Sequence, residues 1–222
     1  MTRRTITHLE KTLNIWAIIL IAWSLYRAKF GTSFPLWFDE LAIKPIVFIA
    51  PILYFIKKIE KKTFFKNVGF EKKNLSKEIG LGLLTGIIFI AVLIFSFLSK
   101  ESFQNFNIFK TLSFISFLYF LVISFATSFS EEILSRGFIL TRILERYKNI
   151  YLSSFFAAIL YFIIHIPILF TDSSLTGALL LKVGVTDLVL GFLLSLVFIL
   201  RKNIIAPIVI HAFYNLFLYF LI

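Results

Sequence analysis

Cysteine is absent from this chain of 222 residues, and histidine is scarce, with only three residues. The absence of cysteine excludes a disulfide framework, a thiol nucleophile and a cysteine-ligated zinc or iron–sulfur centre. Acidic residues are also few, 12 against 23 Lys and Arg, so the formal net charge is +11. Charged residues of both signs make up 16% of the chain, whereas 59% is hydrophobic, including 29 Phe. A soluble globular protein has roughly 45–50% apolar residues, so this composition argues against one.

Several uncharged runs approach the length that a helix needs to cross the hydrocarbon core of a bilayer. The second of these runs carries Lys44 and two prolines, so we expect it to be kinked or partly interfacial. The third begins with Gly80, Gly82 and Gly86, which favours close helix packing. The pattern predicts an all-α fold, a polytopic membrane helix bundle with about seven transmembrane helices, at about residues 13–26, 41–56, 79–98, 111–130, 150–170, 183–200 and 203–222.

Basic residues are distributed unevenly between the two ends of these spans. If the N-terminus is cytoplasmic, 17 of the 23 Lys and Arg lie on the cytoplasmic side, eight of them in the loop 57–78. This bias follows the positive-inside rule and predicts a multi-pass cell-membrane protein with a cytoplasmic N-terminus. The charge therefore orients the protein and contacts membrane lipid, and it does not indicate binding of nucleic acid. In the same loop, Lys is mixed with Phe64, Phe65 and Phe70, which is typical of a segment at the lipid surface.

Ionisable residues inside apolar spans are costly, so the search for function begins with them. The sequence EEILSRG, residues 131–137, stands where the fourth span ends. Glu132 and Arg136 are one helical turn apart, so they can pair while Glu131 points about 100° away. This arrangement leaves Glu131 available as a general base. The alternative is a solvated helix end with a surface ion pair.

Three further polar positions lie within the last three spans. His165 interrupts an apolar run and is either a cavity residue or a core histidine with satisfied hydrogen bonds. His211 and Asn215 are four residues apart and share one helical face. They can present two hydrogen-bond donors to one oxyanion, or they can bond to a neighbouring helix. Asp187 is expected to pair with Lys182 or to hold helices together rather than to do chemistry.

Taken together, these motifs resemble the CPBP family, the CAAX-protease and bacteriocin-processing intramembrane endopeptidases, also called the Abi family. The resemblance covers about residues 114–220 and rests on Glu-Glu-x-x-x-Arg at 131–136, aromatic-x-x-x-His at 161–165 and His-x-x-x-Asn at 211–215. The family usually has Phe where this chain has Tyr161. We therefore expect one membrane domain. Residues 1–110 would form N-terminal transmembrane helices with the basic cytoplasmic loop, and residues 111–222 would form the CPBP-like catalytic core helices.

The resemblance also implies a role for each site residue. In that family the first Glu of the motif and the second-motif His are thought to activate a water for attack on a peptide carbonyl. Here these residues are Glu131 and His165. The remaining residues would bind the developing oxyanion, His211 with Asn215, or brace the site, Glu132 with Arg136.

A metal centre is the alternative to this chemistry. Members of the family are often labelled metalloproteases, and Glu131, His165 and His211 would make a three-ligand zinc site with an open position. The chain lacks the His-Glu-x-x-His spacing of a zinc helix. A donor pair such as His211 and Asn215 suits an oxyanion hole, so a glutamate mechanism with no metal or other cofactor is favoured.

The depth of the site sets a geometric condition. At about 1.5 Å per residue, Glu131 falls near the inner edge of its span, whereas the two histidines lie deeper. Either the fourth helix continues past Ser130 at a buried position, or the fifth begins later than Ile150. Residues 138–147 would then form an amphipathic helix on the inner surface. We expect a cavity in the inner leaflet that opens toward the cytoplasm, where a peptide or protein substrate is cut.

Two other functions remain compatible with this sequence. The first is a non-catalytic bacteriocin-immunity or signalling protein on the same scaffold. The second is an ion-coupled transporter that uses Glu131 and Asp187 as proton sites, although no inverted repeat is detectable. Abundant Lys and Phe suggest an AT-rich microbial genome, so a prenylated substrate is not assumed.

Overall fold

The computed structural model describes residues 7–31, 33–97, 113–171 and 176–221, and every regular element within them is helical. The predicted charges at Arg3, Arg4, Lys100 and Lys110 lie outside the described residues, as does the expected boundary at 110–111. The elements, with η marking a π-helical stretch, are α1 (His8–Phe30), α2 (Leu36–Phe38), η1 (Asp39–Ile43), α3 (Lys44–Tyr54), η2 (Phe55–Ile59), α4 (Phe64–Asn67), α5 (Leu75–Phe97), α8 (Phe114–Glu132), η3 (Ile133–Leu140), α9 (Thr141–Tyr147), α10 (Ile150–Thr171), α11 (Gly177–Arg201) and α12 (Ile205–Leu221).

The chain is a multi-pass helical membrane protein, as its composition predicts. Among the described residues, α12 is a shorter apolar helix, and the predicted second span is an unbroken helix from α2 to η2 that carries Asp39, Glu40 and Lys44. Its expected irregularity takes the form of π-helical stretches on both sides of α3. The predicted number of about seven is therefore approximate. Within the part of the chain that the structure describes, five segments are long and apolar enough to cross a membrane: His8–Phe30, Leu75–Phe95, Phe114–Tyr147, Ile150–Ile168 and Gly177–Arg201.

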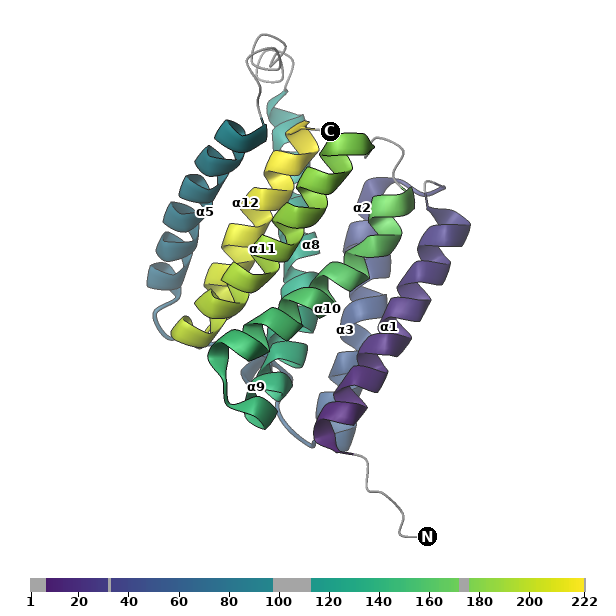
Figure 1. The fold of residues 1–222 in the computed structure, drawn as a ribbon, viewed down its shortest axis with the longest axis vertical. Coiled ribbons are helices and arrows are strands. Elements are labelled where there is room, and N and C mark those ends of the chain that lie inside the picture. The colour runs from purple at the N-terminus through teal and green to yellow at the C-terminus, as the bar shows by residue number, and fades with distance from the viewer. Residues whose placement is uncertain (1–6, 32, 98–112, 172–175, 222) are drawn as a thin grey trace.

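The helices stand roughly side by side, with α1 and α3 on one flank and α5 on the other (Figure 1). Between the flanks lie α8, α11 and α12, and α10 crosses them obliquely. One apolar core gathers around Trp23, Phe48 and Phe138. A second gathers around Leu194 and Ile210, where α11 and α12 meet α5. The bundle is therefore packed around two apolar cores rather than one.

The helix that carries the Glu-Glu motif does not end at the membrane edge. It continues from α8 through η3 into α9, so Phe114–Tyr147 is one helical segment of 34 residues. All of η3 is buried, which places Glu131 near the middle of this segment rather than at its edge. The expectation of a surface helix at 138–147 is wrong for its first part, because Phe138 and the residues beside it pack in the bundle interior, whereas residues 145–147 of α9 are exposed. The first of the two geometric solutions, continuation past Ser130, is the one that the chain adopts.

Close packing of the third span is confirmed at two of its three glycines. A Cβ atom on Gly82 would lie 2.6 Å from Cβ of Val209, and one on Gly86 would lie 3.1 Å from Cγ of Phe213. Both partners belong to α12. Because glycine has no side-chain carbon at these two positions, α5 and α12 can pack closely together. Gly80 faces open space and has no such role.

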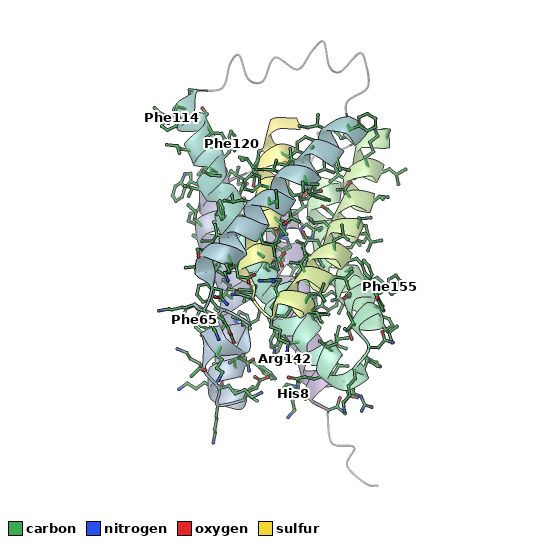
Figure 2. The ribbon with its side chains drawn as sticks, turned by 90° about the vertical axis from the view of Figure 1, so that its left-hand side faces the viewer. His8, Phe65, Phe114, Phe120, Arg142 and Phe155 are labelled. Atoms are coloured by element: carbon green, nitrogen blue, oxygen red, sulfur yellow. The ribbon has the colours of Figure 1, made fainter. Side chains whose placement is uncertain are left out.

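The two ends of the bundle differ in charge. We call the end that carries residues 57–77, α9 and Arg201 the basic end; Figure 2 shows His8, Phe65 and Arg142 there. Arg136, which the sequence places among the charges of this side, is instead fully buried inside the bundle. The described basic residues of the basic end are Lys11, Lys57, Lys58, Lys61, Lys62, Lys66, Lys72, Lys73, Lys77, Arg142, Arg146, Lys148, Arg201 and Lys202.

The lysine-rich segment 57–78 is more ordered than a surface loop. It includes the short helix α4, whose Phe64 is only 7% exposed and packs in the first core with Val68. Phe65 is 59% exposed, whereas Phe70 is partly buried against the same core. Of the three Phe residues expected at the lipid surface, Phe65 is thus the exposed one. The expectation is wrong for Phe64, which is buried.

Candidate active site

A cavity of about 280 Å³ lies in the half of the bundle away from the basic end. Its wall comes from the last turns of α1, from α2 to the start of α3, from α8, from the second halves of α10 and α12, and from the first half of α11. These helices alternate in direction (Figure 1), and the contributing parts of α1, α10, α11 and α12 are the ones remote from the basic end. The expectation that the cavity at Glu131 lies on the side of the 57–78 loop is therefore wrong.

The six residues singled out by the sequence are brought together from three helical segments. Glu131, His165 and Asn215 line the cavity. The other three lie behind its wall with no exposed surface: Glu132, Arg136 and His211.

The Glu131 carboxylate is the centre of this group. Its Oε1 accepts from Nζ of Lys44 at 2.9 Å, and its Oε2 lies 3.1 Å from Nε2 of His165. The Tyr161 hydroxyl and Nε2 of His211 each lie 3.5 Å from the same Oε2, which is long for a hydrogen bond. Glu131 is only 3% exposed, so the partners that offset its burial are Lys44 and His165.

The contacts of His165 define its protons. Its Nδ1 lies 2.9 Å from the backbone carbonyl oxygen of Tyr161, which can only accept a hydrogen bond. Its Nε2 faces the Glu131 carboxylate, which also only accepts when ionised. With Glu131 ionised, both ring nitrogens donate, and His165 is an imidazolium. Lys44 also contacts Glu40 at 2.5 Å, so two cations stand against two carboxylates and the buried charge is balanced.

Glu132 and Arg136 form the ion pair that their spacing predicts. Oε1 of Glu132 accepts from Nη1 of Arg136 at 2.7 Å and from Nδ1 of His211 at 2.8 Å. Nη2 of Arg136 donates to the carbonyl oxygen of Gly191 on α11 at 3.0 Å. Because Glu132 accepts at Nδ1 of His211, it also fixes the tautomer of that ring. These contacts hold α8, α11 and α12 in one register behind the cavity.

The expected donor pair on α12 is not present as such. Nδ1 of His211 is used by Glu132, and its Nε2 lies 3.0 Å from the Tyr161 hydroxyl. The side-chain amide of Asn215 donates to Oγ of Ser128 at 3.1 Å. Of the two, only Asn215 lines the cavity, as does Tyr161, whose hydroxyl contacts Nε2 of His211.

Three groups of the site were missed by the sequence-based assignment: Lys44, Glu40 and the Tyr161 hydroxyl. Lys44 is 1% exposed and Glu40 is 6% exposed, and Thr127 donates to Glu40 at 2.7 Å. A signal was present, because Glu40 and Lys44 are four residues apart next to an apolar run. We interpreted Lys44 as a sign of an interfacial helix instead of a buried partner for a distant carboxylate.

Asp187 lies on the cavity wall and is paired. It accepts a hydrogen bond from the Tyr214 hydroxyl at 2.5 Å, which joins α11 to α12. This contact fits the expected helix-packing role. The expected partner Lys182 is not the residue that the structure places against the carboxylate.

The side chains do not fit a metal ion as they lie. Glu131, His165 and His211 do converge, but within the described residues no group of three or more His, Asp or Glu could hold a metal. The Tyr161 hydroxyl occupies the lone-pair side of Nε2 of His211, where a metal would have to bind. The ammonium of Lys44 already neutralises the other oxygen of Glu131. We therefore derive no chemical step through a metal.

Chemically, the cavity offers a carboxylate, an imidazolium and neutral hydrogen-bond donors at one place in a membrane bundle. A carboxylate can accept a proton from water, and the donors can stabilise negative charge on an oxygen. Low exposure strengthens each of these interactions.

Residues 112–217 match the family described as type II CAAX prenyl endopeptidase Rce1-like. The resemblance to the CPBP family is thereby confirmed over this segment, and it supports an enzyme of the CAAX-protease type. No curated protein and no solved structure matches the chain. Lys44 and Glu40 lie outside the matched segment.

Proposed function

We propose, from the match of residues 112–217 to Rce1-like endopeptidases, that this protein is an intramembrane endopeptidase of glutamate type. The observation that carries the proposal is the Glu131 carboxylate, held 3.1 Å from Nε2 of His165 on the wall of a cavity inside the bundle. A base, a second group to position water and nearby donors are the parts that hydrolysis of a peptide bond requires.

The proposed reaction proceeds in two steps. A water binds between Oε2 of Glu131 and Nε2 of His165. Glu131 takes a proton from this water, and the water oxygen bonds to the peptide carbonyl carbon while the π electrons move to the carbonyl oxygen. Hydrogen-bond donors near His211 and Asn215 stabilise the resulting oxyanion. When the C–N bond breaks, the nitrogen keeps the bonding pair and takes the proton from Glu131. The carboxylate is then restored, and no metal or other cofactor takes part.

The remaining site residues act by position. Oε1 of Glu132 accepts from Nδ1 of His211 at 2.8 Å and from Nη1 of Arg136 at 2.7 Å, so this ion pair orients the His211 ring. Lys44 holds Oε1 of Glu131, which leaves Oε2 directed toward His165. We place the basic end in the cytoplasm and the protein in the cell membrane, where Lys and Arg contact anionic lipid. The substrate is a membrane-associated peptide or protein.

Cleavage by purified protein in lipid vesicles tests this proposal. The probes are two internally quenched peptides, one with a farnesylated C-terminal Cys-aliphatic-aliphatic-x sequence and one without the prenyl group. Glu131→Gln should lower kcat roughly 10²–10⁴-fold, because it removes a general base. The matched control Glu145→Gln changes an exposed carboxylate on α9 and should cleave like wild type.

Two further arms separate the alternatives. Wild-type activity should persist in the presence of a chelator, whereas a loss would support the metal alternative. If Glu131→Gln and His211→Ala both cleave as fast as wild type, the proposal fails. A cellular function that Glu131→Gln still supports would favour the non-catalytic immunity or signalling role.

A further inference from the structure

The cavity and the basic residues lie at opposite ends of the same helices. On α11 the cavity contacts Val183 and Asp187 in the first half, whereas Arg201 is its last residue. On α1 the cavity contacts Arg27, three residues before the helix ends. On α10 it contacts Tyr161 and positions beyond it, which are far from the start at Ile150. On each of these helices, whichever way it runs, the cavity lies toward the end of the bundle that is remote from the basic end.

The charge difference between the ends is large. The basic end carries 14 of the described Lys and Arg residues, and the opposite end carries four. Of those four, Lys44 is buried in ion pairs with Glu40 and Glu131, so it adds no charge to the surface. Such a difference places the basic end in the cytoplasm by the positive-inside rule.

From these two observations we propose that the cavity opens to the extracytoplasmic side of the membrane. Its substrate class is then a peptide segment presented on that side, such as the juxtamembrane part of an exported chain. The identity of the substrate rests on the proposed function. The direction of opening rests only on cavity position and charge, so it stands or falls without catalysis.

The absence of cysteine makes the natural chain a ready background for single-cysteine labelling. Ser33→Cys reports the exposed turn between α1 and α2, and Lys66→Cys reports the basic end. Leu36→Cys and Leu218→Cys place a thiol on the cavity wall. Ser154→Cys is a near-isosteric control at a fully buried position that does not line the cavity.

Each variant is treated in intact cells with a membrane-impermeant maleimide, before and after permeabilisation. We expect Ser33→Cys, Leu36→Cys and Leu218→Cys to be labelled in intact cells, Lys66→Cys only after permeabilisation, and Ser154→Cys in neither. Labelling of Lys66→Cys in intact cells, with Leu36→Cys and Leu218→Cys only after permeabilisation, would overturn the proposal. Labelling of the cavity positions from the same side as Lys66→Cys would also overturn it. Because the readout is labelling, a failure here is distinct from a failure to cleave peptides.

A second feature, independent of orientation, is the hydroxyl group of Tyr161. This residue lines the cavity, whereas His211 behind it does not. Its hydroxyl lies 3.0 Å from Nε2 of His211 and 3.5 Å from Oε2 of Glu131. The hydroxyl therefore stands between the buried imidazole and the space where a substrate carbonyl would bind.

The Tyr161 ring is packed closely by Arg136 and Gly191. The Arg136 guanidinium carbon lies 4.6 Å from the ring centroid, and a Cβ on Gly191 would lie 3.0 Å from Cδ1 of the ring. Tyr161 is 1% exposed. A hydroxyl on a ring fixed in this way is positioned before substrate arrives, which is the requirement for an oxyanion donor.

The protons of His211 explain why the hydroxyl is needed. With Nδ1–H donating to Glu132, neutral His211 has only a lone pair at Nε2 and accepts from Tyr161. When negative charge builds up on a substrate oxygen in the cavity, the phenol hydrogen can turn from Nε2 of His211 to that oxygen, with no net transfer of a proton. We infer that Tyr161 is a catalytic residue whose hydroxyl donates to the oxyanion, with His211 acting through it.

Tyr161→Phe tests this inference, which rests on the proposed function. Phe is the usual residue of the family at this position, so the variant should fold with an unchanged unfolding midpoint. We expect kcat for the quenched peptides to fall on the order of 10²-fold, with KM nearly unchanged, because one oxyanion donor is lost. The control Tyr151→Phe removes an exposed hydroxyl from the same helix and should have no effect.

The outcomes separate this inference from the proposed function. If Tyr161→Phe keeps wild-type kcat while Glu131→Gln is inactive, the role of Tyr161 is refuted and the protease assignment stands. If Glu131→Gln also keeps wild-type kcat, the proposed function fails. If Tyr161→Phe raises KM at constant kcat, the hydroxyl only helps to bind the substrate. If it lowers the unfolding midpoint at constant kcat, the hydroxyl only stabilises the fold.

Discussion

Two buried ionic clusters, one at the basic end and one near the middle of the bundle, look similar in composition and differ in what they face. At the basic end, Nη2 of Arg142 contacts both carboxylate oxygens of Glu60 at 2.8 and 2.9 Å and Oδ1 of Asn67 at 2.7 Å. Its Nη1 donates to the Phe138 carbonyl oxygen at 3.0 Å, and its guanidinium lies 4.4 Å from the Phe138 ring centroid. The other cluster surrounds Glu131.

Neither burial nor a nearby cavity distinguishes the two clusters. Arg142 is 3% exposed, like Glu131, and a cavity of about 420 Å³ lies beside it. The carboxylate that pairs with Arg142, Glu60, does not line that cavity, whereas Glu131 lines its own. Arg142 on α9 contacts Glu60 just after η2, Asn67 on α4 and Phe138 on η3, so its contacts hold these segments together. The comparison teaches that a buried charge indicates chemistry only when the reactive group faces the space that a substrate can enter.

Removing the charge at the basic end should break the comparison most strongly. Arg142→Met leaves Glu60 without its bidentate partner, and loss of one member of a buried ion pair costs about 3–5 kcal/mol. We expect the free energy of unfolding in mild detergent to fall by about this amount, while kcat per folded molecule is unchanged. Arg146→Met, an exposed change on the same helix, should alter it by no more than about 0.5 kcal/mol.

A fall in kcat per folded molecule for Arg142→Met would show that the basic-end cluster takes part in the reaction. The distinction between a structural and a chemical cluster would then be wrong.

Lys44→Met tests the cluster around Glu131, where we expect the loss to appear in kcat. The ammonium group holds Oε1 of Glu131 at 2.9 Å, and a hydrogen bond to a charged group contributes about 1.5–3 kcal/mol. We expect kcat to fall by about 10- to 100-fold in the peptide assay, with a smaller change in KM, because Glu131 is no longer held toward His165.

Glu40→Gln is the matched variant for Lys44, because it alters the neighbouring carboxylate and leaves the contact with Glu131. Its kcat should stay closer to wild type than that of Lys44→Met. Equal kcat values for wild type and Lys44→Met, measured on folded protein, would leave Lys44 as a structural residue only.

Asp187→Asn should have the smallest effect. The amide oxygen of Asn can still accept from the Tyr214 hydroxyl, so the link between α11 and α12 is kept. We expect kcat within about threefold of wild type and a change in unfolding free energy below about 1 kcal/mol, the scale of one neutral hydrogen bond. A loss as large as that of Glu131→Gln would indicate that Asp187 carries protons, as the transporter alternative requires.

Much of the site could be predicted because its motifs are local. Glu132 and Arg136 lie one turn apart and pair as expected, since neighbours on a helix meet whatever surrounds them. The Asn215 amide could not be assigned in the same way, because its partner Ser128 lies on another helix. The role of Lys44 was missed for the same reason.

The amino-acid sequence by itself determined that the chain is a helical membrane protein with one basic side and a Glu-Glu motif among apolar spans. Hydropathy, charge bias and one-turn spacing are properties of neighbouring residues, so they are legible without a fold. Only the tertiary structure decided that the cavity lies away from the basic end, that Lys44 reaches Glu131 and that Tyr161 stands before His211. These contacts depend on how helices pack, because they join residues far apart in the chain whose distances no local pattern encodes.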